Sequence, residues 1–358
     1  MNIFRNIKGY YTNTWVLSNP TVVRRALRGF MRALVFNKST LKTIEVFPSM
    51  QCNLKCEMCS VEKFKKVQGE PLALEDYESI ARQGAREGAI ASTILGGEPL
   101  LYPHVAELLS IFKKYKYFNY IVSNSMMATK ERLRELKSAG LNAICFSLDS
   151  VDPEENDRIR GVKGHYAHVM QAIEWAKSLG LIVSMAPVFF PGAVEKGVEV
   201  VKFCQKNGLG ASGGQAAPVG CWEGKPLLAP EEHDRVRSLM KEYPRLTSDW
   251  ALSYFLKMRC PAGKEKIAIS TYGEVFGCSV NPISYGNVRR ESLASILRRM
   301  RAFSQIKKNS PVCLAAEDTH YVEHYLRPLS EFDHYPVTIE EHPAIRPDEE
   351  PEVFRGRK

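Results

Sequence analysis

Residues 44–219 alternate short apolar stretches with longer stretches of helical periodicity, and this alternation restricts the fold more than any other feature. It is typical of parallel βα units with right-handed crossovers. The apolar stretches predict strands at 44–47, 92–95, 120–122, 143–148, 181–189 and, weakly because of its glycines, 210–219. Helices are expected at 74–87, 105–115, 130–138, 166–179 and 194–206. The predicted fold is α/β, a partial (βα)6 TIM barrel with its active site at the carboxyl ends of the strands.

Three cysteines, Cys52, Cys56 and Cys59, follow the first expected strand in the spacing Cys-x3-Cys-x2-Cys. Soft thiolates in so short a loop can bind three irons of a cubane iron–sulfur cluster, which leaves the fourth iron open to a small molecule. A zinc site would need a fourth Cys or His nearby, and this loop has none. A disulfide framework is disfavoured, because the nine cysteines are an odd number and no signal-peptide pattern is present.

The loop, with apolar Met58 directly before its last cysteine, resembles the signature of the radical S-adenosylmethionine (radical SAM) superfamily. That position is often aromatic in the family, and Met58 is expected to pack near the adenine instead. The resemblance implies a [4Fe–4S] cluster on the three cysteines and S-adenosyl-L-methionine (SAM) on the open iron. It also implies cleavage of SAM to a 5′-deoxyadenosyl radical, with reduced flavodoxin or ferredoxin as electron donor.

Further polar positions follow the expected strands. The motif Gly96-Gly97-Glu98-Pro99 lets the backbone approach a ligand, and its carbonyls and carboxylate can accept hydrogen bonds from an ammonium group. It resembles the family's motif for the methionine amino group. By the same resemblance, Asn124 and Ser147 are expected near the ribose and carboxylate, and Arg160 is expected to bind the methionine carboxylate. Helix caps, strand-end hydrogen bonds or a surface ion pair are the alternative for these three residues.

A second group of cysteines begins at residue 260. Cys260 and Cys278 flank a predicted β-hairpin, and Cys313 follows the next predicted helix. With its turn glycine Gly273, this region resembles the SPASM extension, or its shorter relative twitch, which holds auxiliary [4Fe–4S] clusters. A full SPASM set has seven cysteines, so three predict one auxiliary [4Fe–4S] cluster with an open or non-cysteine fourth ligand. Isolated buried cysteines are the alternative.

The other cysteines and the histidines form no evident metal site. Cys221 follows the sixth expected strand, where a substrate would approach. It can donate a hydrogen atom or complete a cluster, and a packed thiol is the alternative. Cys145 and Cys204 are expected in the core. His320 and His324 can share one helix face, where His320 is a remote candidate ligand and solvent exposure is the simpler interpretation.

The first 43 residues contain eight cations and no acid, in a chain of formal net charge +9. Apolar residues recur at helical spacing over 21–36, with arginines between them, which predicts an amphipathic helix. Such a helix can lie on an anionic membrane surface. Packing on the main domain with a solvated basic face is the alternative. The expected location is the cytoplasm, with peripheral contact to the inner membrane surface, and no nucleic-acid partner is expected.

These patterns divide the chain into five segments. They are a basic amino-terminal segment (1–43), a radical SAM partial barrel (44–220), a connector (221–259) with helices at 231–242 and 249–258, a small α+β auxiliary-cluster domain (260–330) and an extended tail (331–358), either wrapped on the surface or disordered. The expected function is a radical SAM enzyme that abstracts hydrogen from an unactivated C–H bond of a small-molecule, lipid-linked or peptide substrate.

The sequence leaves two alternative functions open. One is a ribosomal-peptide maturase that forms an oxidative cross-link or an epimerised residue. The other is a non-catalytic iron–sulfur electron-transfer protein, which the open iron and the Gly96-Gly97-Glu98 motif disfavour because an electron carrier needs neither.

Overall fold

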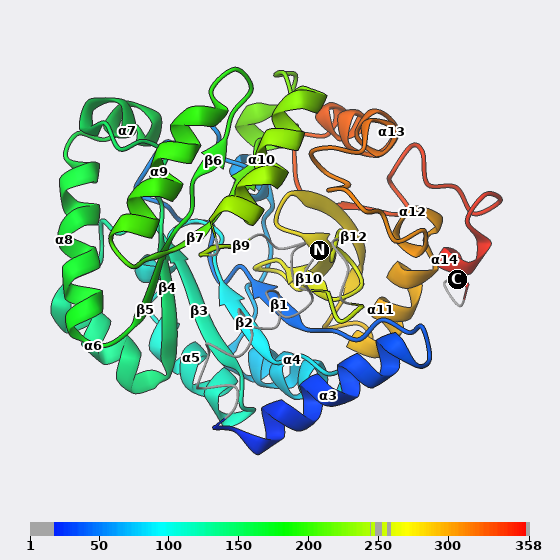
Figure 1. Cartoon of the computed structure of the whole chain (residues 1–358). Helices are drawn as coiled ribbons and strands as arrows, with labels where there is room; N and C mark the ends of the chain where they lie inside the picture. Colours follow the sequence, from blue (N-terminus) through cyan, green and yellow to red (C-terminus); the bar gives the residue numbers. More distant parts are fainter. Residues whose placement is uncertain (1–17, 244, 248–252, 256–258, 356–358) are drawn as a thin grey trace.

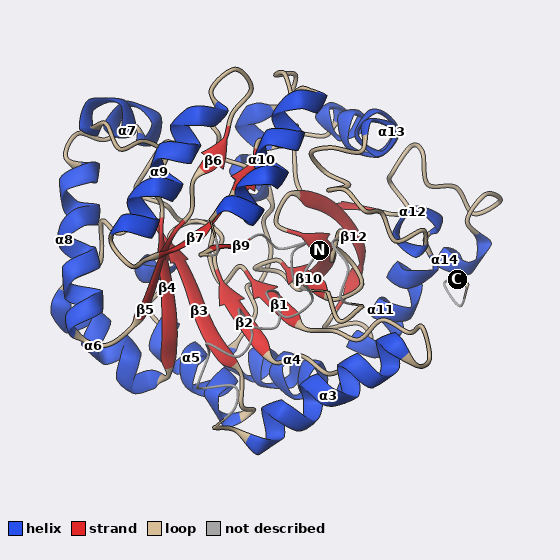
Figure 2. Ribbon diagram, in the orientation of Figure 1, coloured by secondary structure: helices blue, strands red, loops and turns tan. Residues whose placement is uncertain are grey.

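The computed structural model describes residues 18–243, 245–247, 253–255 and 259–355. Within these residues one sheet of eleven strands follows the order β13-β12-β11-β10-β1-β2-β3-β4-β5-β7-β9, and helices cover its outer side (Figure 1 and Figure 2). The strands of the barrel are β1 (Thr43–Val46), β2 (Ala91–Ile94), β3 (Phe118–Ser123), β4 (Leu141–Phe146), β5 (Ile182–Met185) and β7 (Gly210–Ser212). Neighbours among them are parallel, which confirms the predicted partial barrel.

Helices follow the barrel strands close to where the sequence predicts them. They are α4 (Leu74–Arg86), α5 (Val105–Lys114), α6 (Lys130–Ala139), α8 (His165–Ser178) and α9 (Val194–Lys206). Gly88, Gly140 and Gly180 have φ values of 105°, 120° and 70°, which strain other residues, so these glycines end their helices. The structure adds the helix α7 (Pro153–Arg160), which the sequence analysis did not predict.

Each of the last two expected barrel strands is divided in two. Val188–Phe189 forms β6 after β5, and Gly214–Gln215 forms β8 after β7; β6 and β8 pair in parallel as a separate small sheet. Pro187 separates β5 from β6 because it has no N–H to donate to a ladder. The small sheet lies beyond the carboxyl ends of β5 and β7, at the same end of the molecule as α7 (Figure 1).

In the connector, α10 (Pro230–Glu242) confirms the first expected helix and is followed by β9 (Leu246–Thr247). The helix expected over 249–258 falls mostly outside the described residues, so it stays a prediction. None of the helices in the described part of the chain has the length and hydropathy needed to cross a bilayer.

The carboxyl-terminal module shares its sheet with the barrel. Its first strand, β10 (Lys266–Ile269), runs parallel to β1, and the antiparallel strands β11 (Glu274–Cys278) and β12 (Asn281–Asn287) continue the sheet. The predicted hairpin is therefore present and gains a third strand. The helices that follow are α11 (Leu293–Ala302), α12 (Ser304–Lys307) and α13 (Thr319–Tyr321), with helical turns at Val322–Leu326 and Arg327–Glu331.

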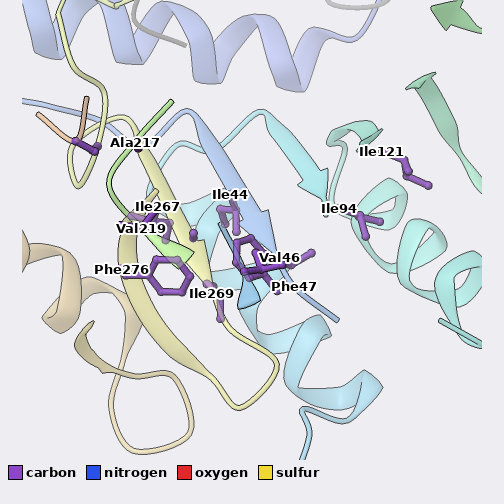
Figure 3. Close-up of a cluster of buried hydrophobic side chains, with 14 of the residues drawn as sticks. Ile44, Val46, Phe47, Ile94, Ile121, Ala217, Val219, Ile267, Ile269 and Phe276 are labelled. Atoms are coloured by element: carbon purple, nitrogen blue, oxygen red, sulfur yellow. The ribbon is translucent and has the colours of Figure 1, made fainter. Parts of the chain in front are cut away.

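The hydrophobic core continues across the junction between barrel and module. Ile44 of β1 and Ile267 of β10 are partners in the strand register and are fully buried (Figure 3). The ring of Phe47 lies 5.6 Å from that of Phe64 and 5.5 Å from that of Phe276, measured between centroids. Phe47 leads into the first cysteine loop and Phe276 lies two residues before Cys278, so one aromatic cluster supports both groups of cysteines.

The tail beyond residue 331 is packed on the molecule as far as residue 355. Val337–Thr338 forms β13 and joins β12 in parallel, and Pro351–Phe354 forms the short helix α14. The side chains of Tyr335, Val337 and Val353 are fully buried. Of the two states considered for the tail, the structure therefore has the wrapped one.

The amphipathic helix predicted over 21–36 is α3 (Pro20–Leu34). Its packed face consists of the small residues Val22, Ala26, Gly29 and Ala33, while larger apolar residues face solvent. The helix thus packs on the main domain, but its exposed face is both basic and apolar. The cations Arg5 and Lys8 lie outside the described residues.

Candidate functional site

The first cysteine loop begins at the carboxyl end of β1 and leads into the 3-10 helix Glu62–Lys66. Cys52, Cys56 and Cys59 are half-buried free thiols. The N–H of Cys59 donates to the carbonyl of Cys56 (3.3 Å), which curls the loop on itself. Burial raises the pKa of Cys56 and raises that of Cys59 to about 11, so a metal must displace a proton from these thiols when it binds.

The glycine motif after β2 holds the segment just before Cys52. The N–H groups of Gly97 and Glu98 donate to the carbonyls of Ser49 (3.0 Å) and Gln51 (2.7 Å). A Cβ on Gly97 would lie 2.1 Å from the Gln51 oxygen, and one on Gly96, where φ is 123°, would lie 2.8 Å from the Ser49 oxygen. Both positions therefore require glycine, because only glycine allows this close approach.

The carboxylate of Glu98 joins the ends of β2 and β3. It accepts hydrogen bonds from the N–H of Leu100 (3.0 Å), the hydroxyl of Ser123 (2.8 Å) and the N–H of Asn124 (2.7 Å). Its burial raises the pKa of this carboxyl, and the three donors act in the opposite direction. Pro99 follows as the first residue of a 3-10 turn. In this structure the carboxylate of Glu98 is thus bound to neighbouring residues, whereas the sequence suggested a free acceptor.

Asn124 lies against the cysteine loop. Its Nδ2 donates to Oδ1 of Asn53 (2.8 Å) and lies 3.7 Å from Sγ of Cys52. Ser147 is buried after the neighbouring strand β4, and its N–H donates to the carbonyl of Ser123 (3.0 Å). The strand-end positions singled out in the sequence are therefore together at one end of the barrel.

Arg160, the last residue of α7, reaches the same loop from another side. Its Nη1 lies 3.8 Å from Sγ of Cys56, and its Nη2 pairs with Oδ2 of Asp149 at 2.5 Å. Gly161 follows in the left-handed conformation, with φ of 72°, and a Cβ there would lie 2.7 Å from the carbonyl oxygen of Lys55. The end of α7 is thus fitted to the cysteine loop.

Two more predicted residues lie in or beside the loop. Met58 is half-exposed between the second and third cysteines. Cys221 follows Gly220, which has φ of 60°, and the N–H of Cys221 donates to the carbonyl of Cys59 (2.9 Å). The backbone at Cys221 therefore contacts the cysteine loop directly, which sequence position alone did not indicate.

Cys260, Cys278 and Cys313 come together in the carboxyl-terminal module. Burial raises the pKa of Cys278 well above its usual value, and the nearby thiols of Cys260 and Cys313 raise it further. The N–H of Cys313 donates to the carboxylate of Glu317 (3.3 Å), and Glu317 also pairs with Arg237. Three buried or half-buried thiols that influence one another electrostatically fit the predicted auxiliary cluster.

A buried ion pair connects this second site to β1. Oε1 of Glu45 pairs with Nζ of Lys266 at 2.7 Å, and Oε2 of Glu45 accepts a hydrogen bond from the N–H of Ser279 (3.0 Å). Ser279 directly follows Cys278. A charged residue of the barrel therefore holds the backbone beside a cysteine of the module.

The remaining cysteines and the two paired histidines lie elsewhere. Cys145 and Cys204 are buried in the core, as expected. The rings of His320 and His324 stack at 4.2 Å between centroids and are exposed. Within the described ranges no three His, Cys, Asp or Glu side chains are close enough to bind a single metal ion. This result is compatible with a cubane, whose cysteines bind separate irons and lie farther apart.

Three polar residues of this region were not predicted from the sequence. Asp149 lies shortly after β4 and directly follows the strand expected over 143–148, a position that could have signalled it, and Asn53 lies inside the cysteine loop. Gln215 ends β8, and both polar atoms of its amide are buried without a hydrogen-bond partner. Only the folded chain distinguishes such an amide from an ordinary surface glutamine.

A parallel partial barrel with three cysteines in the loop after its first strand, and three more in a module that continues its sheet, is the architecture of an iron–sulfur enzyme. Residues 46–204 match the family model of the radical SAM superfamily, and residues 260–315 match that of the SPASM iron–sulfur cluster-binding domain. The chain belongs to the radical SAM superfamily and carries a SPASM domain. Its cofactors are accordingly SAM, the [4Fe–4S] cluster that binds SAM, and auxiliary iron–sulfur clusters in the SPASM domain.

Similar proteins act in more than one kind of pathway. The antilisterial bacteriocin subtilosin biosynthesis protein AlbA of Bacillus subtilis is 28% identical over 306 residues, which cover 80% of this chain and 67% of AlbA. An AdoMet-dependent heme synthase of Methanosarcina barkeri is 22% identical over 299 residues, covering 73% of this chain and 85% of the synthase. Among solved structures, Streptococcus suis SuiB bound to the precursor peptide SuiA superposes with a TM-score of 0.59 at 21% identity, covering 74% of this chain and 66% of SuiB. This last similarity shows the fold alone.

Proposed function

We propose that the chain is a radical SAM peptide maturase that binds its SAM-cleaving cluster through Cys52, Cys56 and Cys59. When bound, the cluster and SAM supply a 5′-deoxyadenosyl radical for hydrogen abstraction from an unactivated C–H bond. The observation that carries the proposal is the convergence of the glycine motif, Asn124 and Arg160 on a loop with three free thiols. Reduced flavodoxin or ferredoxin would provide the electron.

The residues around the loop would hold SAM in distinct ways. Because the Glu98 carboxylate already accepts three hydrogen bonds, the ammonium group of SAM would be bound chiefly by backbone carbonyls of the Gly96–Pro99 motif. Arg160 would bind the methionine carboxylate through its guanidinium, whose Nε has no hydrogen-bond partner. Asn124 and Ser147 would contact the ribose and the carboxylate, and Met58 would pack near the adenine.

The SPASM domain would hold one auxiliary [4Fe–4S] cluster on Cys260, Cys278 and Cys313. The shared sheet and the Glu45–Lys266 ion pair fasten this site to the barrel. A cluster held by these cysteines would supply an electron acceptor for a substrate radical or an anchor for the substrate. Cys221, whose backbone contacts Cys59, would be the hydrogen donor where the product is an epimer.

A peptide substrate is supported by the similarity to AlbA, a protein of bacteriocin biosynthesis. SuiB, which shares the fold, was solved with its precursor peptide bound. The unpartnered amide of Gln215, on the small β6–β8 sheet beyond the barrel strands, also fits this class. The N–H and C=O of one residue in an extended peptide point to the same side and can satisfy both its donor and its acceptor. The second candidate is a small-molecule substrate, which the similarity to the heme synthase favours.

The test has two stages. Anaerobically reconstituted protein is first mixed with SAM and dithionite, and 5′-deoxyadenosine is measured by liquid chromatography. Absence of 5′-deoxyadenosine would favour the alternative of a non-catalytic electron-transfer protein. The enzyme is then co-expressed with each short open reading frame that flanks its gene, and the peptides are analysed by mass spectrometry. Loss of two hydrogens indicates a cross-link, and deuterium uptake from heavy water indicates epimerisation. Unchanged peptides alongside active SAM cleavage would favour the small-molecule candidate.

A further inference from the structure

The helix α3 exposes a stripe of large apolar side chains. Of the seven large apolar side chains exposed among the described residues, five belong to this helix and the two residues after it. They are Leu27, Met31, Leu34, Val35 and Phe36, each between 52% and 69% exposed. The first four follow helical spacing, so they form one continuous outward ridge along a helix of about 22 Å.

The opposite face fixes this ridge in place. Gly29 packs against the ring of Tyr254, and Nη1 of Arg25 donates to the carbonyls of Ala89 (3.3 Å) and Tyr115 (2.9 Å). Ala89 and Tyr115 precede strands β2 and β3. The helix is therefore attached at the amino-terminal end of the barrel, and the outward direction of the ridge is set by the fold.

The surroundings of the ridge are strongly basic. Arg24 and Arg28 are exposed beside it, neither of them in an ion pair with any described residue, and Lys38 follows it. No acidic residue occurs before Glu45. An apolar ridge with unneutralised cations on its flanks complements a surface that is apolar inside and negatively charged outside.

A basic cavity opens beside the start of α3. It has a volume of about 360 Å³ and is lined by Asn19, Lys113, Lys116 and Lys137 together with residues at the starts of β3 and β4. Asn19 is the N-cap of α3, and it places the cavity and the ridge at the same end of the barrel. Three lysines around one cavity of this size fit a phosphate group.

From the ridge, its arginines and the lysine cavity, we propose that the amino-terminal end of the barrel docks on an anionic phospholipid bilayer. The ridge would enter the interface, Arg24 and Arg28 would contact phosphates, and the lysine cavity would bind a lipid headgroup phosphate. The cysteine loop lies at the opposite, carboxyl-terminal end of the strands; α3 runs along the lower edge of Figure 1, whereas α7 and β6 lie at the top. Docking would thus turn the site toward water and suit a water-soluble substrate rather than one embedded in the membrane.

The test is co-sedimentation of the full-length reconstituted protein with vesicles of phosphatidylcholine alone or with 30% phosphatidylglycerol. Binding is expected only with the anionic lipid. Each of Arg24→Gln and Arg28→Gln should weaken it about fivefold, and Leu27→Ser with Met31→Ser should abolish it. The matched controls are Met127→Ser, an exposed apolar residue beyond the carboxyl end of β3, and Lys163→Glu, an exposed cation just after α7. Both lie at the opposite end of the barrel, so neither should change binding. In the lysine cavity, Lys113→Glu with Lys116→Glu should weaken binding to anionic vesicles while leaving the protein folded.

Three results would overturn the proposal. One is equal or absent binding to both vesicle types by the wild type. Another is a dimer in solution that Leu27→Ser with Met31→Ser dissociates without any lipid binding, which would make the ridge a subunit interface. The third is saturation of the lysine cavity by millimolar inorganic phosphate with no vesicle binding, which would identify a site for a free anion. SAM is absent from these assays, so the outcome does not depend on the proposed reaction, and thermal unfolding of each variant checks its folding.

Discussion

Arg160 and Asp149 form an ion pair beside the first cysteine loop, with 2.5 Å between Nη2 and Oδ2. Asp149 is completely buried in its side chain and Arg160 is nearly so, while Nη1 of Arg160 lies 3.8 Å from Sγ of Cys56. Oδ1 of Asp149 also accepts a hydrogen bond from the N–H of Val188, at the start of β6. The pair therefore connects the segment after β4, the end of α7 and the start of β6 to one thiol of the proposed SAM site.

Replacing Asp149 by Asn should lower the free energy of unfolding by about 3 kcal/mol, because it leaves the buried guanidinium of Arg160 without its counter-charge. The measurement is urea unfolding of the reconstituted protein followed by circular dichroism. Glu135→Gln is the control, since it breaks an exposed pair with Arg132 and should have an effect close to zero. An Asp149→Asn protein as stable as the wild type would show that the pair does not stabilise the site.

Replacing Gly97 by Ala should prevent assembly of the SAM-binding cluster. The added Cβ would lie 2.1 Å from the carbonyl oxygen of Gln51, a backbone atom just ahead of Cys52, so the loop would have to move. The expected result is a loss of about four irons per chain on reconstitution, the content of one cubane, and no 5′-deoxyadenosine. Gly214→Ala is the control, because a Cβ there meets nothing within 4 Å. Normal iron content in Gly97→Ala would contradict the tight contact.

Local sequence patterns predicted most of the barrel. The helix α9 has the expected bounds, because its apolar residues repeat at helical spacing, and Gly140 ends α6 as its sequence position suggested. The helix α7 was missed because its eight residues, PEENDRIR, include no apolar stripe. Asp152 caps it by accepting a hydrogen bond from the N–H of Glu155 (2.8 Å), and its remaining support comes from tertiary contacts. The pairing of β10 with β1 joins segments some 220 residues apart, which no local pattern encodes.

The site was also predictable only where its residues form local sequence patterns. The cysteine spacing and the glycine motif are local in sequence, so a resemblance could find them. The ion pair of Arg160 with Asp149 and the contact of Cys221 with Cys59 depend on how distant loops meet at the end of the barrel. The exposed ridge on α3 also required the structure. From sequence, Leu27 and Met31 were indistinguishable from core positions, and the packed face instead uses the smaller Ala26 and Gly29.

His165 should make the protein less stable as the pH falls below about 6.5. It is fully buried at the start of α8, where Nδ1 lies 2.8 Å from Nδ2 of Asn156. Burial, with the charge of Arg160 adding to it, lowers the pKa of His165 to about 4. The unfolded chain therefore binds a proton between pH 6.5 and 4 that the folded chain does not, and stability is lost across that window.

This one group should cost about 1 kcal/mol of unfolding free energy between pH 7.5 and pH 6.0. His165→Gln keeps a hydrogen-bond acceptor but cannot titrate, so its stability should change less over the same range. Urea unfolding at both pH values measures the difference, with the exposed His104→Gln as control. Identical pH dependence in His165→Gln and the wild type would contradict the assigned shift.

The number of clusters can be determined by counting iron. Reconstituted wild type should contain about eight irons per chain, and the variant with Cys260, Cys278 and Cys313 all changed to Ala about four, the content of one cubane. The matched control is Cys145→Ala with Cys204→Ala, which removes two core thiols and should leave the iron content unchanged. The triple variant should still form 5′-deoxyadenosine, because Cys52, Cys56 and Cys59 remain in place. Eight irons per chain in the triple variant would show that these three cysteines do not bind the auxiliary cluster. Four irons per chain in the wild type would show that the SPASM domain of this chain holds no cluster.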